Sequence, residues 1–163
     1  MSAIDTCLRH NRGFADGFAD GDLAAPPVSA LAVVTCMDAR LDPAAVLGLA
    51  PGDAHVIRNA GGVVTDDVLR SLAISQSMLG TREVMLVQHT RCGLLEFDDH
   101  EIEAAIRERT GAAPHFPIQT FSDLEQSVRD GVAELAASPV LAHRDAVRGF
   151  VYEVETGRLR EVG

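Results

Sequence analysis

Residues 84–93 read VMLVQHTRCG, in which a short apolar run leads directly into His89 and then Cys92. An apolar run of this length is typical of a strand buried within a sheet. Cys92 follows His89 by three residues and precedes Gly93, a spacing that suits a turn bringing both side chains onto one ion. The segment therefore predicts a strand that ends in two metal-ligand side chains.

A second apolar run lies upstream, at residues 31–36, where LAVVTC ends in Cys36 and is followed at once by Met37-Asp38-Ala39-Arg40. In an open parallel α/β sheet, functional groups collect outside the carboxyl ends of the strands. Two such strand ends can therefore meet, although about fifty residues separate them in the chain. We expect Cys36, His89 and Cys92 to converge on one metal ion.

Other interpretations of the two thiols are possible. Free cysteine is among the most buried residue types, so each thiol alone is more often a packing residue than a ligand. A disulfide between Cys36 and Cys92 is another alternative, but the chain has three cysteines and no Cys-x-x-Cys pair. In a reducing compartment metal binding is the better account of these thiols. Two thiols and an imidazole suit zinc, and three protein ligands leave a fourth position open, as in catalytic zinc sites.

Asp38 and Arg40 stand beside the first predicted ligand. Two thiolates and a neutral imidazole bring zinc to net charge zero, so its bound water is less acidic than on a three-histidine zinc. Asp38 can either occupy the fourth zinc position or pair with Arg40, whose planar fork grips a carboxylate bidentately. The alternative is an ordinary surface ion pair, worth about 0–1 kcal/mol. Our hypothesis is a latch in which Arg40 holds Asp38 off the metal at higher pH, with the closed site favoured as pH falls.

Three motifs together resemble the β-class carbonic anhydrases, most of all the small bacterial members. The likeness extends from about Leu31 to the C-terminus, and the motifs are Cys36-Met37-Asp38-Ala39-Arg40, Arg58-Asn59-Ala60-Gly61 and His89-Thr90-Arg91-Cys92-Gly93. The resemblance implies one zinc ion per chain on Cys36, His89 and Cys92, a catalytic dyad of Asp38 and Arg40, and assembly into a homodimer or homotetramer. Ala39 replaces the usual Ser, and the charged Arg91 between the ligands is expected to alter the mouth of the pocket.

The predicted fold is α/β, with a central, mostly parallel sheet flanked by helices. We expect one domain over residues 1–163, divided into an N-terminal helical arm (1–27) and a catalytic core (28–163). Phe14 and Phe18 recur in a tandem Phe-Ala-Asp-Gly at a spacing that places both on one helical face. That helix either packs on its own domain or embraces a partner subunit, and the resemblance favours the arm. Further elements are expected as short segments: helices at 43–47, 65–79, 99–110 and 122–137, a strand at 54–58, and an edge hairpin of 147–154 with 159–162.

Composition excludes some partners. The chain has 24 Asp and Glu against 14 Lys and Arg, for a formal net charge of -10, which disfavours binding to nucleic acid. No run approaches the ~20 apolar residues of a membrane span, and the N-terminus lacks the apolar stretch of a signal peptide, so we expect a cytoplasmic protein without a membrane partner. The lack of Trp and the single Tyr favour a small, nearly featureless substrate over one bound by aromatic stacking.

These features predict reversible, zinc-dependent hydration of CO₂ to bicarbonate and a proton, by attack of zinc-bound hydroxide. The alternatives are hydrolysis of carbonyl sulfide or carbon disulfide by the same chemistry, as in relatives of the small members, and a non-catalytic, closed Cys₂-His-Asp zinc module. The turn after residue 58 has two glycines that allow close backbone approach. The expected substrate-pocket residues are Ala60, Gly61, Gly62, Val63, Val64 and Gly93.

Overall fold

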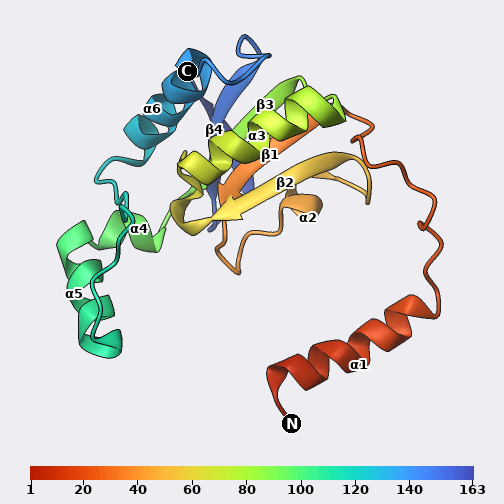
Figure 1. The fold of residues 1–163 in the computed structure, drawn as a ribbon, viewed down its shortest axis with the longest axis horizontal. Coiled ribbons are helices and arrows are strands. Elements are labelled where there is room, and N and C mark those ends of the chain that lie inside the picture. Colours follow the sequence, from red (N-terminus) through yellow and green to blue (C-terminus); the bar gives the residue numbers. More distant parts are fainter.

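The computed structural model describes residues 1–163 and contains one five-stranded sheet with the strand order β2-β1-β3-β4-β5 (Figure 1). The first four of these strands run parallel, and β5 is antiparallel to β4. This confirms the predicted α/β fold and the hairpin at the sheet edge. The strand bounds are β1 Leu31–Cys36, β2 Ala54–Asn59, β3 Glu83–His89, β4 Val147–Glu153 and β5 Arg158–Val162.

The helices begin and end where local side chains favour it. Thr65 accepts a hydrogen bond from Val68 N at the start of α3, and Gly80 ends that helix with a left-handed φ of 75°. Asp42 and Gly48 delimit α2 in the same way. The helix bounds are α1 Ala3–Ala15, α2 Pro43–Leu47, α3 Asp66–Leu79, α4 Gly93–Glu96, α5 Asp99–Thr110 and α6 Leu124–Ala137, with a 3₁₀ turn η1 at Ala60–Gly62.

Helices cover both faces of the sheet (Figure 1). On one face α3 and α6 bury Leu72 and Leu135 against Leu86 and its neighbours. On the other face Val46 and Leu47 of α2 pack against a smaller cluster that includes Val33, Leu41, Val87 and Tyr152. The central strands β1 and β3 are therefore buried on both sides, which explains why their sequences are apolar runs without alternation.

The register of the parallel strands sets which residues meet at the carboxyl edge. Thr35 of β1 lies opposite Val87 of β3, and Cys36 lies opposite Asn59 of β2. The ends of three strands thus reach the same edge, carrying Cys36, Asn59 and His89. This edge is where the sequence predicts the metal ligands to converge.

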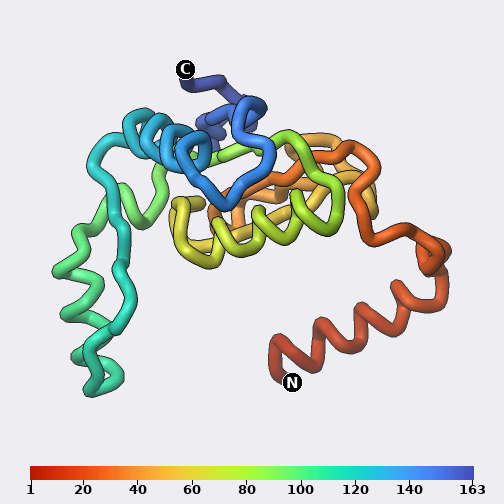
Figure 2. The backbone as a smooth tube through the Cα atoms, turned by 45° about the horizontal axis from the view of Figure 1, so that its top comes forward, coloured from red at the N-terminus to blue at the C-terminus, as the bar shows by residue number.

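The N-terminal helix differs from the prediction in its length. α1 ends at Ala15, so Phe18 lies beyond the helix, although the Phe14 and Phe18 rings remain 5.5 Å apart between centroids. Gly17 ends the first Phe-Ala-Asp-Gly unit and lies between the two Phe residues, and glycine disfavours helix continuation. α1 buries none of its residues and projects away from the sheet (Figures 1 and 2), so it is not packed on its own domain. No helix of the structure is both long enough and apolar enough to span a bilayer.

Candidate metal centre

The structure brings Cys36, His89 and Cys92 together at the carboxyl edge of the sheet. Their ligand atoms all lie within 4.8 Å of one another, and all three side chains are buried. The two sulfur atoms are 4.0 Å apart. Cys36 and His89 are the last residues of β1 and β3, and Cys92 stands immediately before α4. The predicted convergence of these three residues is confirmed.

The imidazole of His89 has one nitrogen committed to the protein and one without a partner. Nδ1 lies 2.8 Å from the carbonyl oxygen of Thr90. A carbonyl only accepts, so Nδ1 carries the proton and Nε2 presents a lone pair. Nε2 is buried and has no hydrogen-bond partner, an arrangement that costs about 1–3 kcal/mol when nothing satisfies the atom. A metal ion is the partner that this tautomer suits, because metal-bound histidines commonly donate their other N–H to a carbonyl.

The two thiols interact strongly with each other. The contact with Cys92 lowers the pKa of Cys36, against the opposing effect of burial, whereas the same contact together with burial raises the pKa of Cys92. Burial alone would lower the pKa of His89, but the contacts with Cys36 and the Thr90 carbonyl outweigh it and raise that pKa. A divalent cation stabilises both thiolates at once. Two sulfurs and one imidazole nitrogen form a donor set that zinc favours, so these residues fit the predicted metal.

Asp38 is held by Arg40 through both of its carboxylate oxygens. Arg40 Nε and the Arg40 backbone N lie 2.9 and 2.8 Å from Oδ1, and Nη2 lies 2.7 Å from Oδ2. These hydrogen bonds, from the Arg40 side chain above all, hold the pKa of Asp38 far below its usual value. Asp38 Oδ2 is also 3.6 Å from His89 Nε2. The carboxylate is therefore ionised, bound by the guanidinium and next to the cluster of Cys36, His89 and Cys92.

Arg58 has a structural role that the sequence did not reveal. Its Nε donates to the carbonyl of Cys36 at 2.9 Å, and its Nη2 donates to the carbonyls of Asp38 and Leu41 at 2.8 and 3.0 Å. One guanidinium thus holds three carbonyls of the loop that carries Asp38 and Arg40. The motif that contains Arg58 indicated only a turn after β2, because the contacts of Arg58 are with the end of β1 and the loop that follows it.

Gly62 explains why the turn after β2 needs glycine. Its φ is 62°, and a Cβ at this position would lie 2.8 Å from the backbone N of Cys36. That distance is too short for real carbon atoms, and the left-handed φ also disfavours other residues. Gly62 therefore lets η1 approach the end of β1 closely.

A cavity of about 240 Å³ lies beside the cluster. Of the expected pocket residues, Ala60, Gly61 and Gly93 line this cavity. Gly62 packs beneath Cys36 instead, whereas Val63 and Val64 line a separate cavity against α6. The remaining walls of the cavity at the cluster are mostly apolar and were not foreseen: Met37, Leu94, Phe97 and Ile102.

Arg91 does not line the cavity beside the cluster. Its side chain points to Glu155, with Nε 2.6 Å from Oε1, and is 66% exposed. The backbone carbonyl of Arg91 instead faces the site, accepting from Arg40 Nη2 at 2.9 Å. The expected effect of the Arg91 charge on the pocket mouth is thus reduced by its pairing with Glu155.

Known proteins share the sequence and the fold. A family model described as "Carbonic anhydrase" matches residues 31–159. "Beta-carbonic anhydrase 1" of Mycobacterium tuberculosis is 47% identical over 162 residues, covering 99% of each chain. "Carbon disulfide hydrolase" of Acidianus sp. is 34% identical over 153 residues, covering 79% of this chain and 75% of the relative. The crystal structure of carbonic anhydrase from Streptococcus mutans superposes with a TM-score of 0.94 at 41% identity, covering 100% of this chain and 99% of that one.

Replacement of Cys92 by serine tests the ligand set. We expect Cys92→Ser to fold but to lose zinc, because a hydroxyl is a poor substitute for a thiolate ligand. Mutation of residues that support a metal ligand typically weakens metal binding by roughly 10–100-fold. Loss of the ligand itself should weaken zinc binding by more than this. Metal analysis of the purified protein measures this, with Cys7→Ser as the control, since Cys7 is exposed on α1. Full zinc occupancy in Cys92→Ser would contradict the assignment.

Proposed function

Because the chain belongs to the β-carbonic anhydrase family and is an enzyme of the carbonic anhydrase (lyase) class, we propose that it binds one zinc ion and hydrates CO₂ reversibly to bicarbonate and a proton. The proposed ligands are Cys36, His89 and Cys92. The proposal depends chiefly on one observation: two buried thiols face a histidine whose Nε2 is buried and has no hydrogen-bond partner. Thiolate ligands require a reducing compartment, so we also propose a cytoplasmic location.

Each proposed site residue has a distinct task. When bound, zinc supplies a Lewis acid that lowers the pKa of water and so yields a nucleophile near neutral pH. The two thiolates partly offset this acidity, and Asp38, ionised beside the cluster, is positioned to accept a proton or hydrogen bond there. Arg40 fixes the direction of the Asp38 carboxylate by its bidentate grip. The apolar walls formed by Leu94, Phe97 and Ile102 suit a small, uncharged substrate.

A second candidate substrate is carbon disulfide or carbonyl sulfide. The Acidianus relative is a carbon disulfide hydrolase, and the mostly apolar walls of the cavity would also accept these linear analogues. The same residues would perform the same attack on carbon. CO₂ remains the first choice, because the relative with the higher identity and coverage is a carbonic anhydrase.

Stopped-flow measurement of CO₂ hydration tests the proposed reaction. The protein should carry verified zinc, the pH should span neutral to mildly alkaline, and carbonyl sulfide and carbon disulfide should be offered in parallel. We expect fast CO₂ turnover that rises with pH. Slow CO₂ turnover with fast turnover of either sulfur compound would move the assignment to the second candidate. One zinc per chain without any of these activities would favour a closed, non-catalytic Cys₂-His-Asp site.

The Arg40→Ala variant tests the latch. Without the guanidinium, Asp38 is free to reach the fourth zinc position, so we expect zinc to be retained while CO₂ hydration falls by about 10–100-fold. Arg40→Lys should not restore the rate, because an ammonium cannot reproduce the bidentate grip. The control is Arg148→Ala, which breaks a comparable bidentate pair with Glu161 on the far hairpin. Wild-type rates in Arg40→Ala would rule out the latch.

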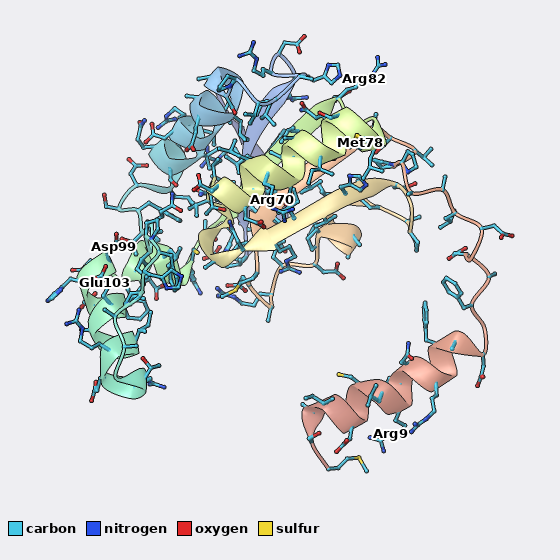
Figure 3. All side chains as sticks on the ribbon, in the orientation of Figure 1. Arg9, Arg70, Met78, Arg82, Asp99 and Glu103 are labelled. Carbon is cyan, nitrogen blue, oxygen red and sulfur yellow. The ribbon has the colours of Figure 1, made fainter.

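We further propose that residues 1–27 form an arm that holds a second copy of the chain in a homodimer or homotetramer. Ile4, Leu8 and Phe14 on α1 are exposed although they are large and apolar. Exposed apolar side chains also occur on α3, at Ile74 and at Met78, the second of which is labelled in Figure 3. Several large apolar side chains left exposed on one helix are typical of an interaction surface.

Substitution on the apolar side of α1 tests the arm. We expect the double variant Leu8→Asp and Phe14→Asp to lower the mass of the assembly measured by light scattering, because a carboxylate is costly to bury at an interface. The core should keep its circular dichroism spectrum, since α1 contributes no buried residue. Arg9→Ala, at a charged position of the same helix (labelled in Figure 3), is the control. An unchanged mass in the double variant would contradict the arm.

A further inference from the structure

We propose that Glu155 is a positioning residue for the metal centre: it holds Thr90 and Arg91, the two residues between the ligands His89 and Cys92, so that their carbonyls face the site. This inference depends on the proposed function for its effect on turnover. Glu155 lies outside all three motifs, just after β4 in the turn that leads to β5. Nothing in its sequence context indicates a role in the site.

Both carboxylate oxygens of Glu155 are used on the ligand loop. Oε1 lies 2.6 Å from Arg91 Nε, and Oε2 accepts a hydrogen bond from Thr90 Oγ1 at 2.7 Å. Thr90 Oγ1 in turn accepts from the backbone N of Val154 at 3.1 Å. The hydrogen bond from Thr90 lowers the pKa of Glu155, as does the nearby Arg91 charge, so the carboxylate is ionised at neutral pH.

The two residues held by Glu155 each present a carbonyl to the metal centre. The Thr90 carbonyl accepts from His89 Nδ1 at 2.8 Å and so fixes the ring and its tautomer. The Arg91 carbonyl accepts from Arg40 Nη2 at 2.9 Å, the same nitrogen that binds Asp38 Oδ2. Glu155 therefore reaches the proposed ligand His89 through Thr90 and the proposed dyad through Arg91.

The backbone of the loop explains why an anchor is needed. Arg91 has a φ of 54°, in the left-handed region of backbone conformation that residues other than glycine rarely adopt. Without an attachment for the Arg91 side chain, the backbone would lower its conformational energy by leaving the left-handed region. The Arg91 carbonyl would then turn away from Arg40. The ion pair with Glu155 attaches that side chain to the end of β4.

An ordinary surface ion pair is the competing interpretation, since the Arg91 and Glu155 side chains are 66% and 38% exposed. Exposed pairs contribute little to stability. The chain contains a matched case in Arg148 and Glu161, which pair across the β4–β5 hairpin with no contact to the ligand loop. Comparison of Glu155 with Glu161 therefore separates a positioning role from the general effect of losing an ion pair.

Glu155→Ala and Glu161→Ala should be compared by two measurements. The first is zinc affinity, by competition with a chromophoric chelator, and the second is kcat/KM for CO₂ with zinc in saturating amount. For Glu155→Ala we expect zinc affinity to fall about tenfold and kcat/KM to fall about three- to tenfold, the effect of one misplaced hydrogen bond. For Glu161→Ala both quantities should stay within about twofold of wild type.

A combined variant shows whether Glu155 acts through the loop. If it does, Glu155→Ala should cause no further loss of zinc affinity or kcat/KM in a protein that already carries Thr90→Val and Arg91→Ala. Residues that act as a unit give non-additive effects. Should Glu155→Ala fail to fold, Glu155→Gln keeps the shape of the side chain but only one acceptor oxygen, and it should show a smaller loss of the same kind.

Two results would overturn the positioning role: wild-type zinc affinity and kcat/KM in Glu155→Ala, or a full additional loss in the combined variant. An absence of CO₂ hydration in the wild-type protein would instead overturn the proposed function. The zinc-affinity comparison would still decide whether Glu155 positions the loop, so the two failures are distinguishable.

Discussion

The parallel pairing of β1 with β2 and β3 is the constraint on which the metal centre depends. The register places Thr35 opposite Val87, so that Cys36 and His89 end neighbouring strands at one edge. A slip of one residue would shift the end of β1 by about 3.3 Å relative to β3 and so separate Cys36 from His89 along the strands. Gly62 tightens the constraint, because the turn after β2 passes so close to Cys36 N that a Cβ would not fit.

Around these strand ends, the charged side chains mainly donate hydrogen bonds to backbone carbonyls. Arg58 binds the carbonyls of Cys36, Asp38 and Leu41, and Arg40 binds that of Arg91 as well as the Asp38 carboxylate. These groups lie partly in solvent, where ion pairs contribute little to the free energy of folding. Their effect is to fix orientations: Arg58 and Arg40 hold peptide groups in the segments beside the cluster of Cys36, His89 and Cys92, and Arg40 also holds the Asp38 carboxylate.

The sequence predicted what depends on local chemistry. Asp42 with Gly48 and Thr65 with Gly80 delimit helices through contacts within a few residues, and the apolar runs before Cys36 and His89 identified the central strands. The meeting of the three ligands followed from the topology of parallel sheets. The end of α1 before Phe18 was missed, because the spacing of the two rings outweighed the glycine between them.

Residues that act over long separations in the chain were also missed. Arg58 reaches Cys36 across 22 positions and Glu155 reaches Thr90 across 65, and neither lies in a pattern that marks its partner. The same holds for Phe97 and Ile102 in the wall of the cavity. Val63 and Val64, which were expected there from their place after the glycine turn, line a different cavity.

The wall made by Phe97 and Ile102 lies on a part of the chain with few ties to the sheet. Neither α4 nor α5 contains a buried residue, and α5 projects from the core at the end opposite α1 (Figures 1 and 2). Two of the three proposed metal ligands, Cys36 and His89, by contrast end the central strands, whereas Cys92 stands at the start of α4. Much of the proposed metal centre and the outer wall of the cavity therefore lie on different parts of the fold. In evolutionary terms, substitutions along α4 and α5 beyond Cys92 could exchange one proposed linear substrate for another while the proposed zinc chemistry stayed intact.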